Sequence, residues 1–254
     1  MSMQRIPSRI SLLLILPIAL ASAAMAQDPQ TASSTKPAPA AQAVQGTAAT
    51  PEGTSLPVAN STLPVEVLVE SPAMAAGDLQ VICLFQSSPE NKLAGSLVVL
   101  DQHLNGLLSA MRSAQFFHGD FGETLVIEPK PGSIKARRLL VVGLGDRATF
   151  TPQREELVGE IVYQESEHLG ADEPNFAPTI LDGGVTGFNT GEVAKEFLRG
   201  FLRGRAIATQ LHVSGAGHAA TITKLTFLAG ATHAADTRDG LAAVLNAPAT
   251  TKAP

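Results

Sequence analysis

The sequence predicts an α/β fold with three layers, in which a mixed sheet lies between two layers of helices. Apolar runs typical of strands alternate along the chain with segments whose apolar residues recur every three or four positions, as they do in helices. A Pro-Gly turn at residues 129–132 joins two of the strands, which indicates an antiparallel pair within the sheet. The 254 residues, 44% of them apolar, suffice for one medium domain, and the single cysteine excludes a disulfide-stapled fold.

The first half of the domain alternates strands with one helix. Residues 65–70 alternate apolar and charged side chains, as in a half-buried strand near a sheet edge. Residues 79–85 are almost continuously apolar, which predicts a central strand covered on both faces. Leucines and a methionine at helical spacing over residues 97–111 predict one helix, and strands follow at residues 124–127 and 139–142.

The second half contains three predicted helices. Thr151 and Pro152 begin a helix that Gly170 ends after about residue 169. The remaining predicted elements are a short strand at 179–181, a helix at 192–208, a strand at 222–228 and a helix at 236–245.

The N-terminal residues have the pattern of a cleavable export signal. Two arginines precede an apolar stretch at residues 10–21, and Ala24-Met25-Ala26 supplies the small residues of a cleavage site. We therefore expect a signal peptide over residues 1–26, a periplasmic or secreted protein, and no membrane span after cleavage. Residues 27–63, rich in Ala, Pro and Thr, are expected to form a disordered linker before a folded domain at 64–248 and a loose tail at 249–254.

Several motifs together carry a family resemblance. The most specific is Arg-Leu-Leu-Val-Val-Gly-Leu-Gly at residues 138–145, supported by the strand at 79–85, the leucine-rich segment at 93–106 and the lead-in at 116–124. The chain resembles the N-terminal domain of the leucyl aminopeptidase family, peptidase family M17. The resemblance implies a macro-domain-like α/β/α unit, which in the family precedes a separate catalytic domain.

The resemblance also bears on catalysis. The family's catalytic half binds two metal ions through a lysine and several carboxylates, next to an Asn-Thr-Asp-Ala-Glu-Gly-Arg-Leu type motif. Residues 1–254 contain no match to that motif, and the acidic pair Glu155-Glu156 is expected on the surface. We therefore expect no catalytic residues, metal ligands or cofactor in this chain.

Two glycine-rich turns supply the candidate ligand-binding residues. They are Gly143, Leu144, Gly145 and Asp146 in the first turn, and Asp182, Gly183 and Gly184 in the second. The first turn fits the short dinucleotide pattern Gly-x-Gly-x-x-Ala, but the next helix signal comes six residues later, so a tight strand exit explains it better. The second turn could present N–H groups to an anion, although glycines serve ordinary loops as well.

The functional prediction is binding. We expect an exported, non-catalytic domain that binds a protein partner or a small anionic ligand. The alternative is an accessory subunit of a metal-dependent aminopeptidase whose catalytic subunit is supplied in trans. Nucleic-acid binding through the basic cluster Lys130, Lys135, Arg137 and Arg138 is a lower alternative, since the formal net charge is −5 and the chain has one tyrosine and no tryptophan.

Overall fold

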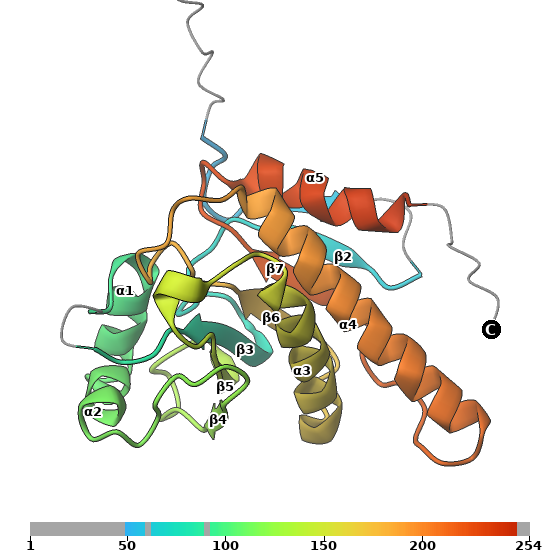
Figure 1. Cartoon of the computed structure of the whole chain (residues 1–254), viewed down its shortest axis with the longest axis horizontal. Helices are drawn as coiled ribbons and strands as arrows, with labels where there is room; N and C mark the ends of the chain where they lie inside the picture. The colour runs from blue at the N-terminus through green and yellow to red at the C-terminus, as the bar shows by residue number, and fades with distance from the viewer. Residues whose placement is uncertain (1–48, 59–61, 89–91, 248–254) are drawn as a thin grey trace, which may run out of the picture. The chain divides into compact units, whose positions relative to one another are not determined.

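The computed structural model describes residues 49–58, 62–88 and 92–247, in which one seven-stranded mixed sheet lies between helices (Figure 1). The strands are β1 (Ser55–Val58), β2 (Val65–Leu68), β3 (Gly77–Leu84), β4 (Thr124–Ile127), β5 (Ala136–Gly143), β6 (Pro174–Ala177) and β7 (Leu225–Leu228). The helices are α1 (Gly95–His103), α2 (Leu107–Ser113), α3 (Arg154–Leu169), α4 (Thr190–Val213) and α5 (Ala234–Leu245), with a 3-10 turn at Arg147–Thr149. The predicted α/β class with a mixed sheet is confirmed.

The strand order is β1-β2-β7-β6-β3-β5-β4. Strand β3 is central and runs parallel to both β5 and β6, while β7 runs parallel to β6 and β2. Only β1 and β4, the two outer strands, are antiparallel to their neighbours. The carboxyl ends of five strands therefore lie along the same edge of the sheet.

The side chains of β3 divide between two cores because successive residues of a strand point to opposite faces. Val81 and Cys83 belong to the larger core, which α3, α4 and α5 cover. Ile82 and Leu84 belong to the smaller core, which α1 and α2 cover. All four are at most 2% exposed, as the continuous apolar run predicts for a strand covered on both faces.

Helices α3 and α4 approach each other through glycine. A methyl group on Gly159 of α3 would overlap the carbonyl oxygen of Phe197, and one on Gly200 of α4 would overlap the carbonyl oxygen of Glu156. Glycine at both positions permits close backbone contact between the two helices.

The predicted single helix over residues 97–111 is wrong. Asn105 and Gly106 have φ values of 55° and 79°, which no α-helix accommodates, and the chain forms α1 and α2 instead. The Asp101 carboxylate accepts hydrogen bonds from the backbone N–H groups of Leu108 and Ser109, at 2.8 and 3.2 Å, and so caps the start of the second helix.

Two further predictions need correction. The short strand expected at 179–181 lies earlier in the chain, as β6 (Pro174–Ala177), because Thr179 has φ 49° and turns the chain out of the sheet. The expected linker also ends too late, since Ser55–Val58 forms the edge strand β1 on β2. Leu63, also assigned to the linker, is 1% exposed and packs in the larger core.

The expected signal peptide at 1–26 and the tail at 249–254 lie outside the described residues. Within the described part of the chain, no helix is long and apolar enough to cross a bilayer.

Candidate functional site

A cavity of about 490 Å³ lies at the carboxyl edge of the sheet. Its lining includes Val69 and Glu70 directly after β2, Ala177 and Pro178 at the end of β6, and Ala229 after β7. Its volume falls within the range of about 300–1,000 Å³ that small-molecule sites occupy. Open α/β sheets bind their ligands at this edge, so the cavity is the candidate site.

Three helices begin at the cavity. Ser96 in the first turn of α1, Thr190 and Val193 in the first turn of α4, and Thr237 in the first turn of α5 all line it. The first N–H groups of a helix have no partner within that helix, and the helix dipole places partial positive charge there.

At two of the three helices, side chains of the chain itself already lie at the positively charged helix start. Ser96 donates a short hydrogen bond from its hydroxyl to the Asp182 carboxylate. The Asn189 side chain caps α4 by accepting the N–H of Gly191 at 2.7 Å. In contrast, the buried hydroxyl oxygen of Thr190 has no hydrogen-bond partner among the described residues.

Apolar side chains form much of the cavity lining, and its charged side chains are acidic. Phe188 and Phe227 contribute aromatic surface, whereas Glu52, Glu70 and Asp182 contribute carboxylates. None of the described residues that line the cavity is a lysine or an arginine, and His233 is the one histidine among them.

Of the seven predicted ligand-binding residues, only Asp182 lines the cavity. A methyl group on Gly143 would overlap the carbonyl oxygen of Asp120, and one on Gly145 would lie 3.1 Å from the side chains of Phe121 and Arg154. The first glycine turn therefore accommodates the neighbouring loop at 119–121. Leu144 is fully buried and Asp146 caps the 3-10 turn by accepting the N–H of Ala148 at 2.9 Å.

In the second turn, Gly183 and Gly184 do not line the cavity, although Asp182 does. A methyl group on Gly183 would lie 2.5 Å from the ring of Phe85, and one on Gly184 would lie 3.1 Å from the Arg147 guanidinium. Ligand binding by either glycine turn stays a prediction.

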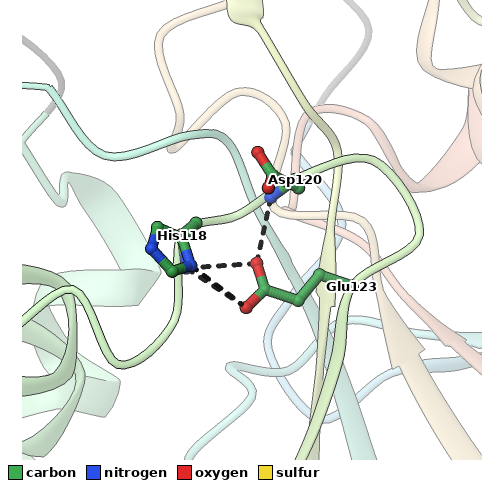
Figure 2. Close-up of side chains that lie close together, drawn as sticks. All are labelled: His118, Asp120 and Glu123. Carbon is green, nitrogen blue, oxygen red and sulfur yellow. Dashed lines mark hydrogen bonds and ion pairs between the residues drawn. The ribbon is translucent and has the colours of Figure 1, made fainter.

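A second group of polar side chains lies in the loop before β4, and Figure 2 shows its members His118, Asp120 and Glu123. Ligand atoms of the three lie within 4.8 Å of one another, a geometry that could hold a metal ion. The Glu123 carboxylate, however, accepts hydrogen bonds from the backbone N–H groups of His118, Gly119 and Asp120, the shortest at 2.7 Å. Its clearest role is to fix the conformation of this loop. The sequence pattern does not single out this group, because a histidine and two acids in a loop are common without a metal.

The expected surface position of Glu155 is wrong. Glu155 is fully buried in the first turn of α3, and neither carboxylate oxygen has a hydrogen-bond partner among the described residues. Burial raises the pKa of Glu155 to about 8. Burial, together with the nearby Glu155, also raises the pKa of the Cys83 thiol well above its usual range, which suits an inert core residue.

Two residues of the basic cluster, Arg137 and Arg138, have partners within the chain, and so does a further arginine on α4. The Arg137 Nε atom lies 3.7 Å from the Oδ1 atom of Asp78. Arg138 donates a hydrogen bond of 2.7 Å to the carbonyl oxygen of Leu169. On α4, Arg203 pairs with Glu156 at 2.7 Å and also contacts Glu160. Acidic groups between the basic ones break up a continuous positive surface, which phosphate binding requires.

Comparisons with known proteins agree with the family resemblance. Residues 81–200 match the model of the cytosol aminopeptidase family, N-terminal domain. A stretch of 75 residues is 37% identical to a probable cytosol aminopeptidase of Thermosynechococcus vestitus, and it covers 30% of this chain and 15% of that protein. The chain thus spans a small part of this relative. The predicted resemblance to the N-terminal domain of this family is confirmed.

Solved structures agree on the fold. A tomato leucine aminopeptidase variant aligns with a TM-score of 0.52 and 19% identity, over 77% of this chain and 38% of that one. A variant of the Oceanobacillus iheyensis macrodomain with ADPR aligns with a TM-score of 0.51 and 13% identity, over 76% of this chain and 100% of that one. At these identities the likeness concerns the fold alone, and it confirms the macro-domain-like architecture.

Proposed function

We propose that this chain, whose residues 81–200 match the N-terminal domain of the cytosol aminopeptidase family, is a non-catalytic binding domain that holds a small molecule in the cavity. The observation that carries the proposal is a cavity of about 490 Å³ at the carboxyl ends of β2, β6 and β7, bordered by three helix N-termini. The macrodomain that aligns over its full length was described with ADPR, which supports a small-molecule ligand for this fold. The charge of the ligand that this chain binds is set by its own lining residues, since the likeness to that macrodomain concerns the fold.

We also propose that the domain is exported from the cytoplasm, because residues 1–26 have the sequence pattern of a signal peptide. N-terminal sequencing of the chain recovered from the exported fraction of expressing cells tests it. A mature terminus close to residue 27 is expected, and an intact residue 1 in the cytoplasmic fraction contradicts it.

A titration followed by ¹H–¹⁵N NMR tests the binding function. The purified chain is titrated with a panel of small metabolites that includes ADP-ribose, and amide shifts are mapped onto the structure. We expect saturable shifts at Thr190, Ala229 and Gly230, and their loss in Ala229→Phe, which adds a ring to the lining. Shifts confined to Gly143–Asp146 would instead place the site at the first glycine turn and contradict the cavity as the site.

The second candidate function is an accessory role beside a metal-dependent aminopeptidase, and the family match favours it. The end of α4 offers a surface for such a partner, since Ile207, Leu211 and Val213 are exposed there. Hydrolysis of leucine-p-nitroanilide separates the candidates. The purified chain should show no turnover with or without Mn²⁺ or Zn²⁺, while a copurifying partner should bring metal-dependent activity with it.

Turnover that stays with the chain through rigorous purification would contradict both the binding and the accessory function. Metal analysis of the same sample identifies the ion responsible in that case.

A further inference from the structure

The charged groups that line the cavity are strongly unbalanced. Glu52, Glu70 and Asp182 are carboxylates, and no described lining residue is a lysine or an arginine. Aspartate and glutamate side chains supply negative charge at neutral pH. A ligand that enters this cavity therefore meets negative side chains from three separate segments of the chain.

Backbone hydrogen bonds fix these segments around the cavity. The N–H of Thr50 donates to the carbonyl oxygen of Ala231 at 2.9 Å, and the N–H of Gly53 donates to that of Val69 at 2.7 Å. Residues 50–53 are thereby tied to the segments that follow β2 and β7, and they bring Glu52 to the lining. The N–H of Ser71 donates to the Glu70 carboxylate at 2.8 Å, which holds that side chain after β2.

The helix N-termini do not compensate for the acidic lining. The Asp182 carboxylate already lies at the start of α1, where it accepts the Ser96 hydroxyl and where a methyl group on Gly95 would overlap it. The Asn189 side chain already accepts the N–H of Gly191 at the start of α4. The chain itself thus occupies, at two of the three helices, positions that would otherwise attract a phosphate.

The rest of the lining suits an apolar body with a polar tip. Phe188, Val193 and Phe227 offer apolar surface, and the polar residues Thr179, Thr190 and Thr237 also line the cavity.

We propose that the cavity binds a small organic cation, an amine on a compact apolar body, and discriminates against phosphates and carboxylates. The inference rests on the proposed function, because it names the ligand class of the same cavity. Its physical basis is charge complementarity: a carboxylate attracts an ammonium group, whereas an anion in the same position is repelled.

Four probes of different charge test this class. The purified chain is titrated with 3-phenylpropylamine, 3-phenylpropanol, 3-phenylpropionate and ADP-ribose, and the amide shifts of Val193, Ala229 and Gly230 are followed by NMR. We expect the amine to bind with a Kd about tenfold below that of the alcohol, since a hydrogen bond to a charged group adds that much affinity. The two anions should leave these amides unshifted.

Variants connect the preference to the carboxylates. Asp182→Asn and Glu70→Gln should each raise the Kd of the amine about tenfold and leave that of the alcohol unchanged. Asp239→Asn is the matched control, because Asp239 is exposed, pairs with the adjacent Arg238 and does not line this cavity. Thermal unfolding of each variant verifies that it is folded.

The outcomes separate this inference from the proposed function. Binding of 3-phenylpropionate or ADP-ribose in the cavity as tightly as the amine overturns the cation preference but leaves the cavity as a ligand site. Amine binding that is unaffected by both carboxylate variants overturns it as well. If no probe of any charge shifts the cavity amides, both proposals fail.

Discussion

The hydroxyl of Thr179 hydrogen-bonds both backbone polar groups of Cys83. It accepts the Cys83 N–H at 3.0 Å and donates to the Cys83 carbonyl oxygen at 2.6 Å. The Thr179 side chain thus continues the hydrogen bonding of β3 beyond the end of β6, next to the cavity. Thr179 has the unusual φ of 49° in this arrangement.

Thr179→Val should destabilise the fold by about 1–3 kcal/mol, because two buried backbone groups lose their partner. Urea unfolding of the wild type and the variant measures the change. Thr179→Ser keeps the hydroxyl and should stay within about 1 kcal/mol of the wild type. A loss of stability in Thr179→Ser with none in Thr179→Val would mean that the methyl group of Thr179, not its hydroxyl, matters for stability.

Gly200→Ala should lower the free energy of unfolding by about 1–3 kcal/mol, since the added methyl overlaps the carbonyl oxygen of Glu156 and forces α3 and α4 apart. The better helix propensity of alanine offsets part of that loss, by up to about 1 kcal/mol. Gly187→Ala is the control, because no atom lies within 4 Å of the added methyl there. A stabilised Gly200→Ala variant would refute the close approach of the two helices.

Glu155 should make the stability depend on pH. The carboxyl has a pKa of about 8 in the folded chain against a reference value of 4.5. Its contribution is therefore fully present below about pH 4.5, falls as the pH rises toward 8 because the unfolded chain releases the proton first, and is lost above that. The slope in this window is about 1.4 kcal/mol per pH unit.

The variant Glu155→Gln carries no titratable group, so it should flatten the stability profile between about pH 4.5 and 8. Denaturant unfolding at several pH values measures the profile. Glu192→Gln, an exposed residue in the first turn of α4, should retain the wild-type slope. An unchanged slope in Glu155→Gln would show that Glu155 is not the group responsible.

Glu123→Gln should loosen the loop that joins α2 to β4. The carboxylate accepts three backbone N–H groups, and charged acceptors make stronger hydrogen bonds than neutral ones. We expect faster hydrogen exchange at the Gly119 amide and a loss of about 1–2 kcal/mol in stability. The exposed Glu128 gives the control variant Glu128→Gln, in which neither quantity should change.

The sequence was sufficient to predict elements whose structure depends on local features, such as a strand buried on both faces or a helix that ends at a glycine. The run at 79–85 is apolar on both faces because β3 lies at the centre of the sheet, and the strand is therefore readable from composition alone. Gly170, at φ 62°, ends α3 as predicted, because the left-handed conformation at a helix end favours glycine.

The wrong predictions concern residues whose conformation or burial is determined by tertiary contacts. Asp101 caps α2 only because the chain turns back at Asn105, which hydrophobic spacing does not reveal. Glu155 has the helix-start position of a surface acid but faces the core. The cavity collects residues such as Glu52 and His233 that are far apart in sequence, so of the candidate site only Asp182 was found.

The parallel pairing of β2 with β7 has a consequence for synthesis on the ribosome. Val65 pairs with Leu225 and Leu68 with Leu228, so the inner edge of β2 has no partner until the chain has grown past residue 228. Contacts of such long sequence separation raise the contact order and slow folding. During synthesis, the edge of β2 that faces away from β1 therefore stays without its partner strand until β7 has left the ribosome.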